Sequence, residues 1–508
     1  MGGVSTTSLV ERTAIALAGA ALVWLVLLHA VMVGTEAPME MRDGAMLATT
    51  EALLRGENPY AIPGLLETGN VYGIGYPLVV APFAWLLGPG FATHRLVAAL
   101  GILGASSIVF SWLRRGGLGL GDALLGTGLV YAGLVYYTGA AARPDGVGVF
   151  LMLAAIEAMR RDDLGTRGYV IGLALSLLGL VCKIYFVWPA FAAATYVFLC
   201  RDWRRGLAYG VAAIGATAAT LILTNALLPG YAAFVLVANI RASDYEFSYL
   251  LRQMRDWSLF DLPLLAAGAV LLWRARGRIA RRRDVGLFAA MTVLSTIALV
   301  FCLGGDPGAH LSYFFELLSP FLAVTVLAAA ARQPLALSVF RLALPVAALI
   351  NAHWFPLDPG RIAAAETRFA ETRMLIDGGR AVLASTEFAG LLAEEHRPLA
   401  ATGHARYFVN AAHYDPPFWL APLLPPSGIL NSVWDRHCAE IRLRIERQRY
   451  DLALTDPWPG SLIPLDLLAK RYRVVRMLTI DMPWALQTWP IQVWRPRSGM
   501  AAASTPPG

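Results

Sequence analysis

The amino-acid sequence predicts a polytopic α-helical membrane protein that ends in a soluble α/β domain. Of its 508 residues, 57% are hydrophobic and 15% are charged, against roughly 25% charged residues in an ordinary soluble domain. The mean hydropathy is positive, at +0.55. A soluble chain of this length would form two or three domains with polar surfaces, and too little charge is present to cover them. The composition therefore excludes a water-soluble enzyme, a disordered protein and a fibrous protein.

Eleven apolar runs predict membrane-spanning helices, since a helix that crosses a bilayer needs about 20 mostly apolar residues. The first run, Ala14–Val33, contains no charge and exceeds the apolar core of a signal peptide, so we expect it to be retained. The further runs, in approximate bounds, are 93–113, 118–138, 144–160, 166–182, 184–200, 206–228, 258–275, 284–303, 310–331 and 336–354.

The basic residues predict the orientation of these helices. With the N-terminus in the cytoplasm, the short inner segments hold 17 basic residues, and the outer segments, longer in total, hold 8. This excess follows the positive-inside rule, and eleven spans then place the C-terminal domain outside the cytoplasm. The large outer segments are 34–92 and 229–257. Within the first, Tyr76–Leu87 contains Pro77 and Pro82, so we interpret it as an interfacial segment on the outer leaflet.

The composition changes near residue 355. Residues 1–355 include 45 charged residues. Residues 356–508 form a segment less than half as long, yet they include 32. This change predicts a membrane domain over 1–355 and an extracytoplasmic α/β domain over 356–508, which we expect to be a packing or acceptor-docking module. Alternating apolar patterns predict its elements. The expected strands are Ala381–Ser385, Pro398–Thr402, Tyr450–Thr455, Val474–Leu478 and Pro490–Trp494, and the expected helices are Glu387–His396, Asn431–Gln448 and Ile463–Arg471.

The first outer segment carries a specific series of motifs. Asp43 follows the first span, Leu53–Tyr60 reads LLRGENPY, Val71–Pro77 reads VYGIGYP, and Arg95 opens the second span. The series resembles the start of the GT-C glycosyltransferases that take sugars from polyprenyl phosphates, in the branch of protein mannosyltransferases and aminoarabinose transferases. In layout the resemblance extends over about residues 10–330. Where that family often has a second acidic residue, this chain has Gly44.

The resemblance implies a multi-pass glycosyltransferase of the bacterial inner membrane. Such an enzyme moves a hexosyl or pentosyl group, with inversion, from a polyprenyl-phosphate donor to a glycan, lipid or protein acceptor on the outer side. The net charge of +7 does not indicate a nucleic-acid partner, because the arginines fall in short clusters between apolar runs. The cysteines and histidines show no metal-binding spacing. The sequence thus indicates no cofactor, and it leaves open whether a divalent metal assists.

Asp43 is the first candidate for a catalytic base, and Glu40 is the second. Sugar transfer needs a base to take the proton of the acceptor hydroxyl. The phosphate leaves easily and needs cations rather than a proton donor. The alternative for Asp43 is a membrane-surface carboxylate paired with Arg42 or Arg55. The resemblance favours the base for Asp43, whereas for Glu40 the structural role is favoured.

Two outer helix ends carry further candidates. Arg143 and Asp145 lie between the third and fourth spans, where the family often has an Arg-x-Asp pair that lines the cavity. Two roles are open for this pair. Arg143 binds the donor phosphate and Asp145 binds substrate, or the two residues form a simple ion pair. Lys183, one of two lysines beside 40 arginines, joins the fifth and sixth spans. Relatives place a lysine there toward the lipid phosphate; snorkelling to the interface is the alternative.

The segment after residue 304 carries the last candidates. His310, Tyr313 and Glu316 are spaced for adjacent faces of one helix that enters the membrane from outside. In relatives, a tyrosine-containing segment before a proline, here Pro320, lies near the donor. His310 is thus a candidate for the donor phosphate and Tyr313 and Glu316 for substrate; a polar helix cap, with Glu316 bonded inside the bundle, is the alternative. The other substrate-binding candidates, from the motifs of the first outer segment, are Tyr60 and Tyr76.

Two other classes of protein fit parts of the sequence. A transporter or flippase of lipid-linked sugars predicts internal repeats and broken, charged helices near the midplane of the bilayer. The sequence instead concentrates carboxylates at the outer ends of its spans and shows no inverted repeat. A non-catalytic scaffold of the cell envelope explains the outer domain but not the motifs of the first outer segment.

Overall fold

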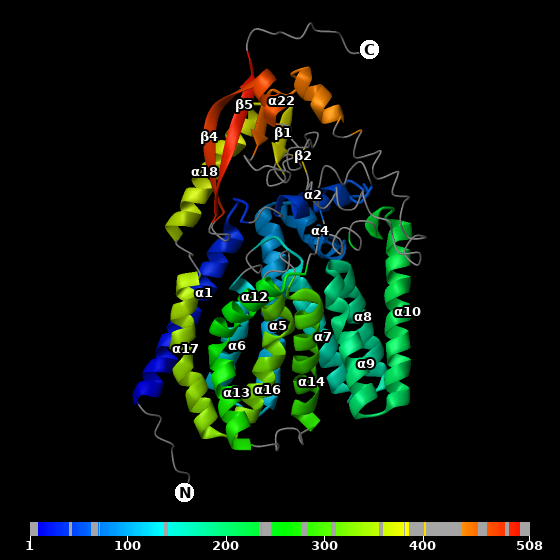
Figure 1. Ribbon diagram of the computed structural model, residues 1–508, viewed down its shortest axis with the longest axis vertical. Coiled ribbons are helices and arrows are strands. Elements are labelled where there is room, and N and C mark those ends of the chain that lie inside the picture. Colours follow the sequence, from blue (N-terminus) through cyan, green and yellow to red (C-terminus); the bar gives the residue numbers. More distant parts are fainter. Residues whose placement is uncertain are drawn as a thin grey trace.

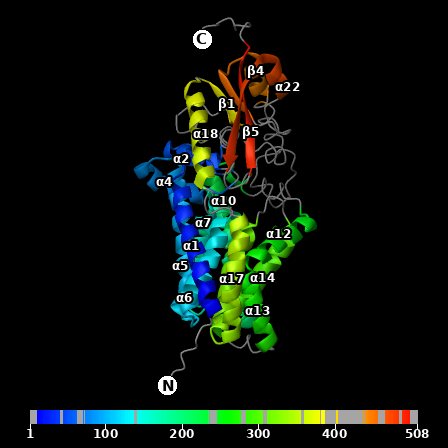
Figure 2. The same cartoon turned by 90° about the vertical axis from the view of Figure 1, so that its left-hand side faces the viewer.

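In the computed structural model, a helical bundle carries a five-stranded sheet at one end. Figures 1 and 2 show that the start of the first helix and the sheet lie at opposite ends of the long axis. The structure describes residues 9–39, 43–61, 70, 72–136, 141–232, 235, 245–275, 283–305, 311–354, 359–379, 381–385, 401–402, 436, 439–455, 465–482 and 487–497.

Helices overlap each range that the sequence predicts to cross the membrane. They are α1 (Leu9–Gly34), α5 (Phe91–Arg115), α6 (Leu120–Leu134), α7 (Asp145–Arg161), α8 (Thr166–Cys182), the 3-10 turn η2 (Ile184–Val187) followed by α9 (Trp188–Cys200), α10 (Trp203–Leu227), α12 (Phe247–Phe260), α13 (Leu262–Ala275), α14 (Arg283–Ala298) continued by the π-helical η5 (Leu299–Leu303), α15 (Ser312–Leu317), α16 (Ser319–Ala330) and α17 (Pro334–Trp354).

Among the described residues, four helices are long and apolar enough to cross a membrane, and a bent pair makes a fifth. The four are α1, α5, α10 and the helix over Gly286–Leu303. Several other helices are apolar but shorter, such as α8 and α16. The count of eleven spans therefore stays a prediction.

One predicted span is wrong in its bounds. The range 258–275 is not one helix, because the chain bends by 84° between α12 and α13. The bend falls at Asp261, two residues before Pro263. A proline disfavours helical geometry in the residue before it and lacks the amide that a continuous helix would need. At the bend, the Asp261 carboxylate accepts a hydrogen bond from the hydroxyl of Ser319, at the start of α16.

A close contact between α5 and α7 positions the site described below. Gly101 of α5 faces Gly146 of α7 so closely that a Cβ atom on Gly101 would lie 2.5 Å from the Gly146 carbonyl carbon. Only glycine permits this approach, which packs α5 at Gly101 against the first turn of α7. Arg95 lies six residues before Gly101 in α5, and Asp145 directly precedes Gly146 in α7.

Two short helices cover the sheet-facing end of the bundle (Figure 1). They are α2 (Asp43–Leu54) and α4 (Gly75–Leu87). The predicted interfacial segment is thus a helix with Pro82 inside it. Its last turn exposes Trp85 and Leu86, by 78% and 70%. This apolar surface matches the membrane-facing position that the sequence predicts for the segment.

The sheet confirms the five strands predicted from the sequence. Its order is β2-β1-β3-β5-β4, parallel between β2, β1 and β3, and antiparallel for β3–β5 and β5–β4. The helix α18 (Pro359–Asp377) leads into it, and the described part of the predicted helix Asn431–Gln448 is helical over 439–446. The predicted helix Glu387–His396 lies outside the described residues. The other elements are β1 (Val382–Ser385), β2 (Ala401–Thr402), β3 (Leu452–Thr455), α22 (Leu465–Arg471), β4 (Tyr472–Met482) and β5 (Gln487–Pro496).

One hydrophobic cluster joins the sheet region to the bundle. It contains Leu47 of α2 and Phe91 of α5 together with Phe369 of α18 and residues of the sheet such as Leu454. The rings of Phe91 and Phe369 meet edge to face, with centroids 6.2 Å apart. The C-terminal part of the chain therefore packs directly over the first turns of α2 and α5.

Candidate active site

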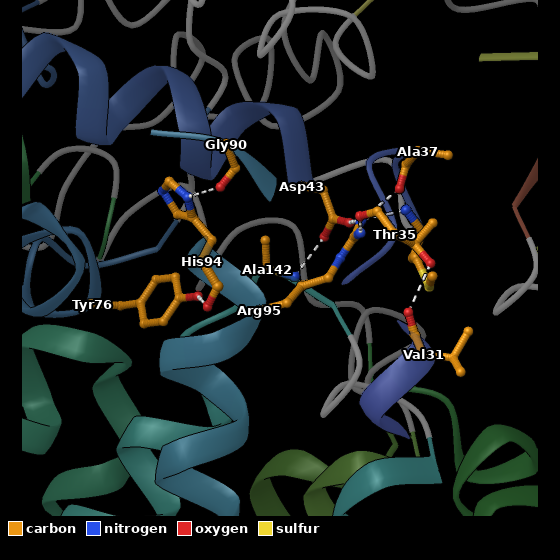
Figure 3. Close-up of polar contacts among 10 residues, drawn as sticks. Val31, Thr35, Ala37, Asp43, Tyr76, Gly90, His94, Arg95 and Ala142 are labelled. Carbon is orange, nitrogen blue, oxygen red and sulfur yellow. Dashed lines mark hydrogen bonds and ion pairs between the residues drawn. The ribbon is translucent and has the colours of Figure 1, made fainter. Parts of the chain in front are cut away.

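Asp43, the first residue of α2, is fully buried, and both of its carboxylate oxygens are bonded (Figure 3). Oδ1 accepts a hydrogen bond of 2.9 Å from the amide of Ala142. Oδ2 accepts one of 3.0 Å from the amide of Met39 and one of 2.9 Å from Nη2 of Arg95. A buried carboxylate is stable only when its lone pairs are satisfied in this way.

Arg95 is the partner that neutralises Asp43. It is also fully buried, and its guanidinium donates to the carbonyl of Ala37, at 2.6 Å, and to that of Thr35. The sequence named Arg42 and Arg55 as alternative partners of Asp43. The structure instead pairs Arg55 with Glu57, at 2.8 Å, and Arg42 lies outside the described residues.

A second set of polar contacts holds the first turn of α5 beneath α2. His94 Nε2 lies 2.8 Å from the hydroxyl of Thr50, and its Nδ1 lies 3.0 Å from the carbonyl of Gly90. The hydroxyl of Tyr76 donates to the carbonyl of His94 at 2.6 Å (Figure 3). Tyr76 therefore ties α4 to α5 in this structure.

Asp145 is the centre of the second cluster. It is the first residue of α7, and it is buried with Arg143 and Lys183 around it. Nζ of Lys183 lies 2.7 Å from one carboxylate oxygen, and Nε of Arg143 lies 3.2 Å from the other. Two cations therefore contact this one carboxylate.

Lys183 is buried rather than extended toward the interface. The helix α8 ends at Cys182, and Lys183 has an extended backbone before η2 begins. Its ammonium lies 4.9 Å from the ring centroids of both Tyr185 and Tyr313 and 5.3 Å from that of Tyr72. Rings around an ammonium stabilise its charge without neutralising it. Snorkelling therefore does not describe this residue.

Glu316, in α15, completes the cluster from the opposite side. It is buried and accepts a hydrogen bond from the hydroxyl of Tyr185, which lies 3.4 Å from Asp145 Oδ1. Its other oxygen, Oε1, has no hydrogen-bond partner among the residues that the structure describes. Tyr313 of the same short region packs edge to face on Tyr185, at 4.6 Å. The structure thus brings Glu316 and Tyr313 close to Lys183.

The turn between α2 and α4 is fitted against the end of α8. The amide of Gly73 donates to the carbonyl of Cys182 at 3.1 Å. A Cβ atom on Gly75 would lie 2.8 Å from the amide nitrogen of Cys182. The hydroxyl of Tyr60 donates to the carbonyl of Tyr72, at 2.7 Å, and so holds the turn from behind. These contacts place the Tyr72 ring beside Lys183.

The segment Ala142–Asp145 joins the two clusters. Its first residue donates its amide to Asp43, and its last residue binds Lys183. The guanidinium carbon of Arg143 lies 5.2 Å from the centroid of the Tyr72 ring. Asp43 and the Asp145 cluster are therefore two parts of one buried polar region at the sheet-facing end of the bundle.

Sequence reasoning selected most members of this region but not all. The sequence places Arg95 at the start of the second span but does not indicate its partner. Tyr72, in the motif VYGIGYP, and Tyr185, two residues after Lys183, are further members that the motifs alone do not identify. Glu40 and His310 lie outside the described residues. Among the described residues, no group of three or more His, Cys, Asp or Glu side chains is arranged to hold a metal ion.

Comparison with known proteins gives a likeness in fold. No protein-family model and no curated protein matches the chain. The chain is similar to the crystal structure of ArnT from Cupriavidus metallidurans in the apo state, with a TM-score of 0.56 and 14% identity over 93% of this chain and 96% of that one. It is similar to the same ArnT bound to undecaprenyl phosphate, with a TM-score of 0.55 and 14% identity over 95% and 99%.

The likeness covers almost the whole chain. It shows that the chain has the fold of these ArnT structures. Together with the long apolar helices, this fold defines an integral membrane protein.

Proposed function

We propose that this chain is a membrane glycosyltransferase that takes a sugar from a polyprenyl-phosphate donor. The observation that carries the proposal is the buried pair of cations, Arg143 and Lys183, oriented by Asp145 and framed by tyrosine rings. The fold in which they lie is that of an ArnT crystallised with undecaprenyl phosphate. A phosphate monoester or diester is the ligand that such a pair of donors recognises.

The proposed reaction is a single displacement. The acceptor hydroxyl loses its proton to a base and its oxygen bonds to the anomeric carbon of the sugar. The bond from that carbon to the phosphate oxygen breaks, and its electron pair stays on the polyprenyl phosphate. Lys183 and Arg143 stabilise the charge that grows on this leaving group. One displacement inverts the anomeric centre.

Asp43 is the proposed base, with Glu40 as the second choice. Asp43 is bonded through Ala142 to the segment that carries Arg143, so it lies next to the proposed phosphate site. In this structure its oxygens are taken by Arg95 and two amides. As a base it exchanges one of these contacts for the acceptor hydroxyl. In this proposal Tyr60, Tyr76 and the other substrate-binding candidates shape the cavity around the sugar.

We propose the orientation that the basic residues predict. The N-terminus lies in the cytoplasm of a bacterium. The domain over residues 356–508, which contains the sheet, lies outside the inner membrane. The polar region of Asp43 and Asp145 then faces the outer leaflet. A glycan, lipid or protein acceptor approaches from the side of the sheet.

The lipids of cells that lack the chain test the proposal. We expect one polyprenyl-phosphate sugar to accumulate, because its consumer is missing, and to return to normal when the wild-type chain is restored. Mass spectrometry of the extracted lipids measures it and also identifies the sugar. The Lys183→Ala variant should fail to restore the normal level. An unchanged set of polyprenyl-phosphate sugars in the deleted strain would contradict the proposal.

A flippase of lipid-linked sugars is the second candidate function. The broken pair α12–α13 favours it, because transporters build their sites at interrupted helices. Purified protein in liposomes separates the two: a flippase moves the intact donor between leaflets, whereas a transferase releases free polyprenyl phosphate only when the acceptor is present.

A further inference from the structure

A cavity of about 350 Å³ lies at the end of the bundle opposite the sheet. This is the lower end of the bundle in Figure 1. The cavity is bounded by the last residues of α5, α7 and α16, by the first turns of α14 and by Arg201 after α9. Its volume falls in the range of small-molecule sites, about 300–1,000 Å³. It is separate from the Asp43 and Asp145 region at the other end.

Four arginines line this cavity: Arg115, Arg160, Arg201 and Arg332. Only two carboxylates neutralise them among the described residues. Glu157 forms ion pairs with Arg115, at 2.7 Å, and with Arg160, at 2.9 Å. It also pairs with Arg161, which does not line the cavity. Asp163 lies 3.4 Å from Arg201. For Arg332, which is exposed, the described part of the chain shows no carboxylate partner.

Three of the four arginines, Arg115, Arg160 and Arg201, are held by neighbouring side chains. The Trp112 indole donates to Glu157 at 2.6 Å, so Glu157 fixes two guanidinium groups against a buried ring. Arg201 also lies over the ring of Tyr196, at 5.9 Å. A guanidinium presents a planar fork that matches the oxygens of a phosphate, and prior fixing lowers the entropy lost on binding.

The floor of the cavity is apolar. Trp112, Phe288 and Val324 are 3%, 5% and 2% exposed, and the rings of Trp112 and Phe288 lie 4.8 Å apart. The charged mouth and apolar floor match an amphiphile. A soluble phosphate compound would use the charged mouth alone, whereas the glycerol and first methylenes of a lipid would also contact the apolar floor.

We propose that this cavity, defined by Arg115, Arg160, Arg201 and Arg332 over Trp112, binds the phosphate headgroup of an anionic phospholipid. The lipid comes from the leaflet at the end of the bundle opposite the sheet. Basic pockets between membrane helices bind such headgroups, because the charge is attracted there at low dielectric. The inference does not depend on the proposed function of the other end.

Native mass spectrometry of the full-length chain, purified in neutral detergent, tests the proposal. The probes are dioleoyl phosphatidylglycerol and, for comparison, dioleoyl phosphatidylcholine. The wild-type chain should retain phosphatidylglycerol at concentrations where it retains no phosphatidylcholine. In the double variant Arg201→Gln/Arg332→Gln, the apparent Kd for phosphatidylglycerol should rise roughly 30-fold, because each of the two basic groups near a membrane phosphate contributes on the order of 1 kcal/mol.

The matched control is Arg167→Gln/Arg204→Gln. It removes two exposed arginines from the same end of the bundle, outside the cavity, and it should bind as the wild type does. Equal loss in both double variants would overturn the proposal, because general surface charge would then explain binding. Equal retention of the two lipids by the wild type would also overturn it. Displacement of the lipid by glycerol 3-phosphate at similar concentration would reassign the cavity to a soluble phosphate.

Discussion

Lys183 is the residue on which the proposed donor site depends most. Its ammonium is 2.7 Å from Asp145 and lies among three tyrosine rings. A hydrogen bond to a charged group contributes about 1.5–3 kcal/mol, so Lys183→Ala should weaken binding of undecaprenyl phosphate by roughly 10- to 100-fold. Lys183→Arg should keep part of the affinity, because the charge remains although the geometry differs.

The other lysine of the chain supplies the control for this prediction. Lys470 is exposed in α22, in the sheet region. Lys470→Ala should bind undecaprenyl phosphate as the wild type does. Titration of the lipid into purified protein measures all three variants. An unchanged Kd for Lys183→Ala, in protein that elutes as the wild type, would remove Lys183 from the phosphate site.

Asp43 has a structural role in addition to the proposed catalytic one. An asparagine has one acceptor oxygen, and it cannot serve Ala142 on one side and Met39 with Arg95 on the other. Breaking a buried ion pair costs about 3–5 kcal/mol. Asp43→Asn and Arg95→Met should therefore each lower the unfolding midpoint clearly. The double variant should cost less than the sum of the two, because both remove the same pair.

Catalysis separates the two substitutions. If Asp43 is the base, Asp43→Asn should reduce turnover by roughly 10²-fold or more, measured on folded protein. Arg95→Met retains the carboxylate and should keep more activity than Asp43→Asn at equal stability. Equal turnover in the two variants would show that the pair acts only by positioning, and the role of base would pass to Glu40 or Asp145.

At the scale of elements, the start of α4 depends on Gly75. A Cβ atom on Gly75 would lie 2.8 Å from the backbone nitrogen of Cys182, which cannot move without shifting Lys183. Overpacking of this kind costs about 1–3 kcal/mol. Gly75→Ala should lower stability by that amount and weaken undecaprenyl phosphate binding. Gly210→Ala in α10, where a Cβ atom meets nothing within 4 Å, is the control and should change neither.

The elements of the chain were largely predictable from the sequence, and the pairing between them was not. Apolar runs and strand patterns located the helices and the five strands, because period and length are local properties. The bend at Asp261 is not predicted, because the apolar run continues through it and Pro263 is its only local signal. The partner of Asp43 lies 52 residues away in sequence, at Arg95, and no local pattern reports such a pair.

At the scale of the whole molecule, the two ends of the bundle differ in character. One carries the sheet and the Asp43 and Asp145 region, and the other carries the arginine cavity. In a variant without native cysteines, Gln333→Cys should be protected from an impermeant thiol reagent in intact cells. Thr367→Cys in α18 should be labelled, because the proposed orientation places the sheet end outside the cytoplasm. The reverse pattern would invert the proposed orientation.

The most direct measurement is the release of free polyprenyl phosphate by the purified chain. Lipid-linked sugars from the bacterium that encodes it serve as donors, and its envelope fraction supplies the acceptor. We expect release that requires both fractions, that matches the sugar gained by the acceptor, and that falls in Lys183→Ala but not in Lys470→Ala. Absence of acceptor-dependent release by folded wild-type protein would contradict the assignment of a glycosyltransferase.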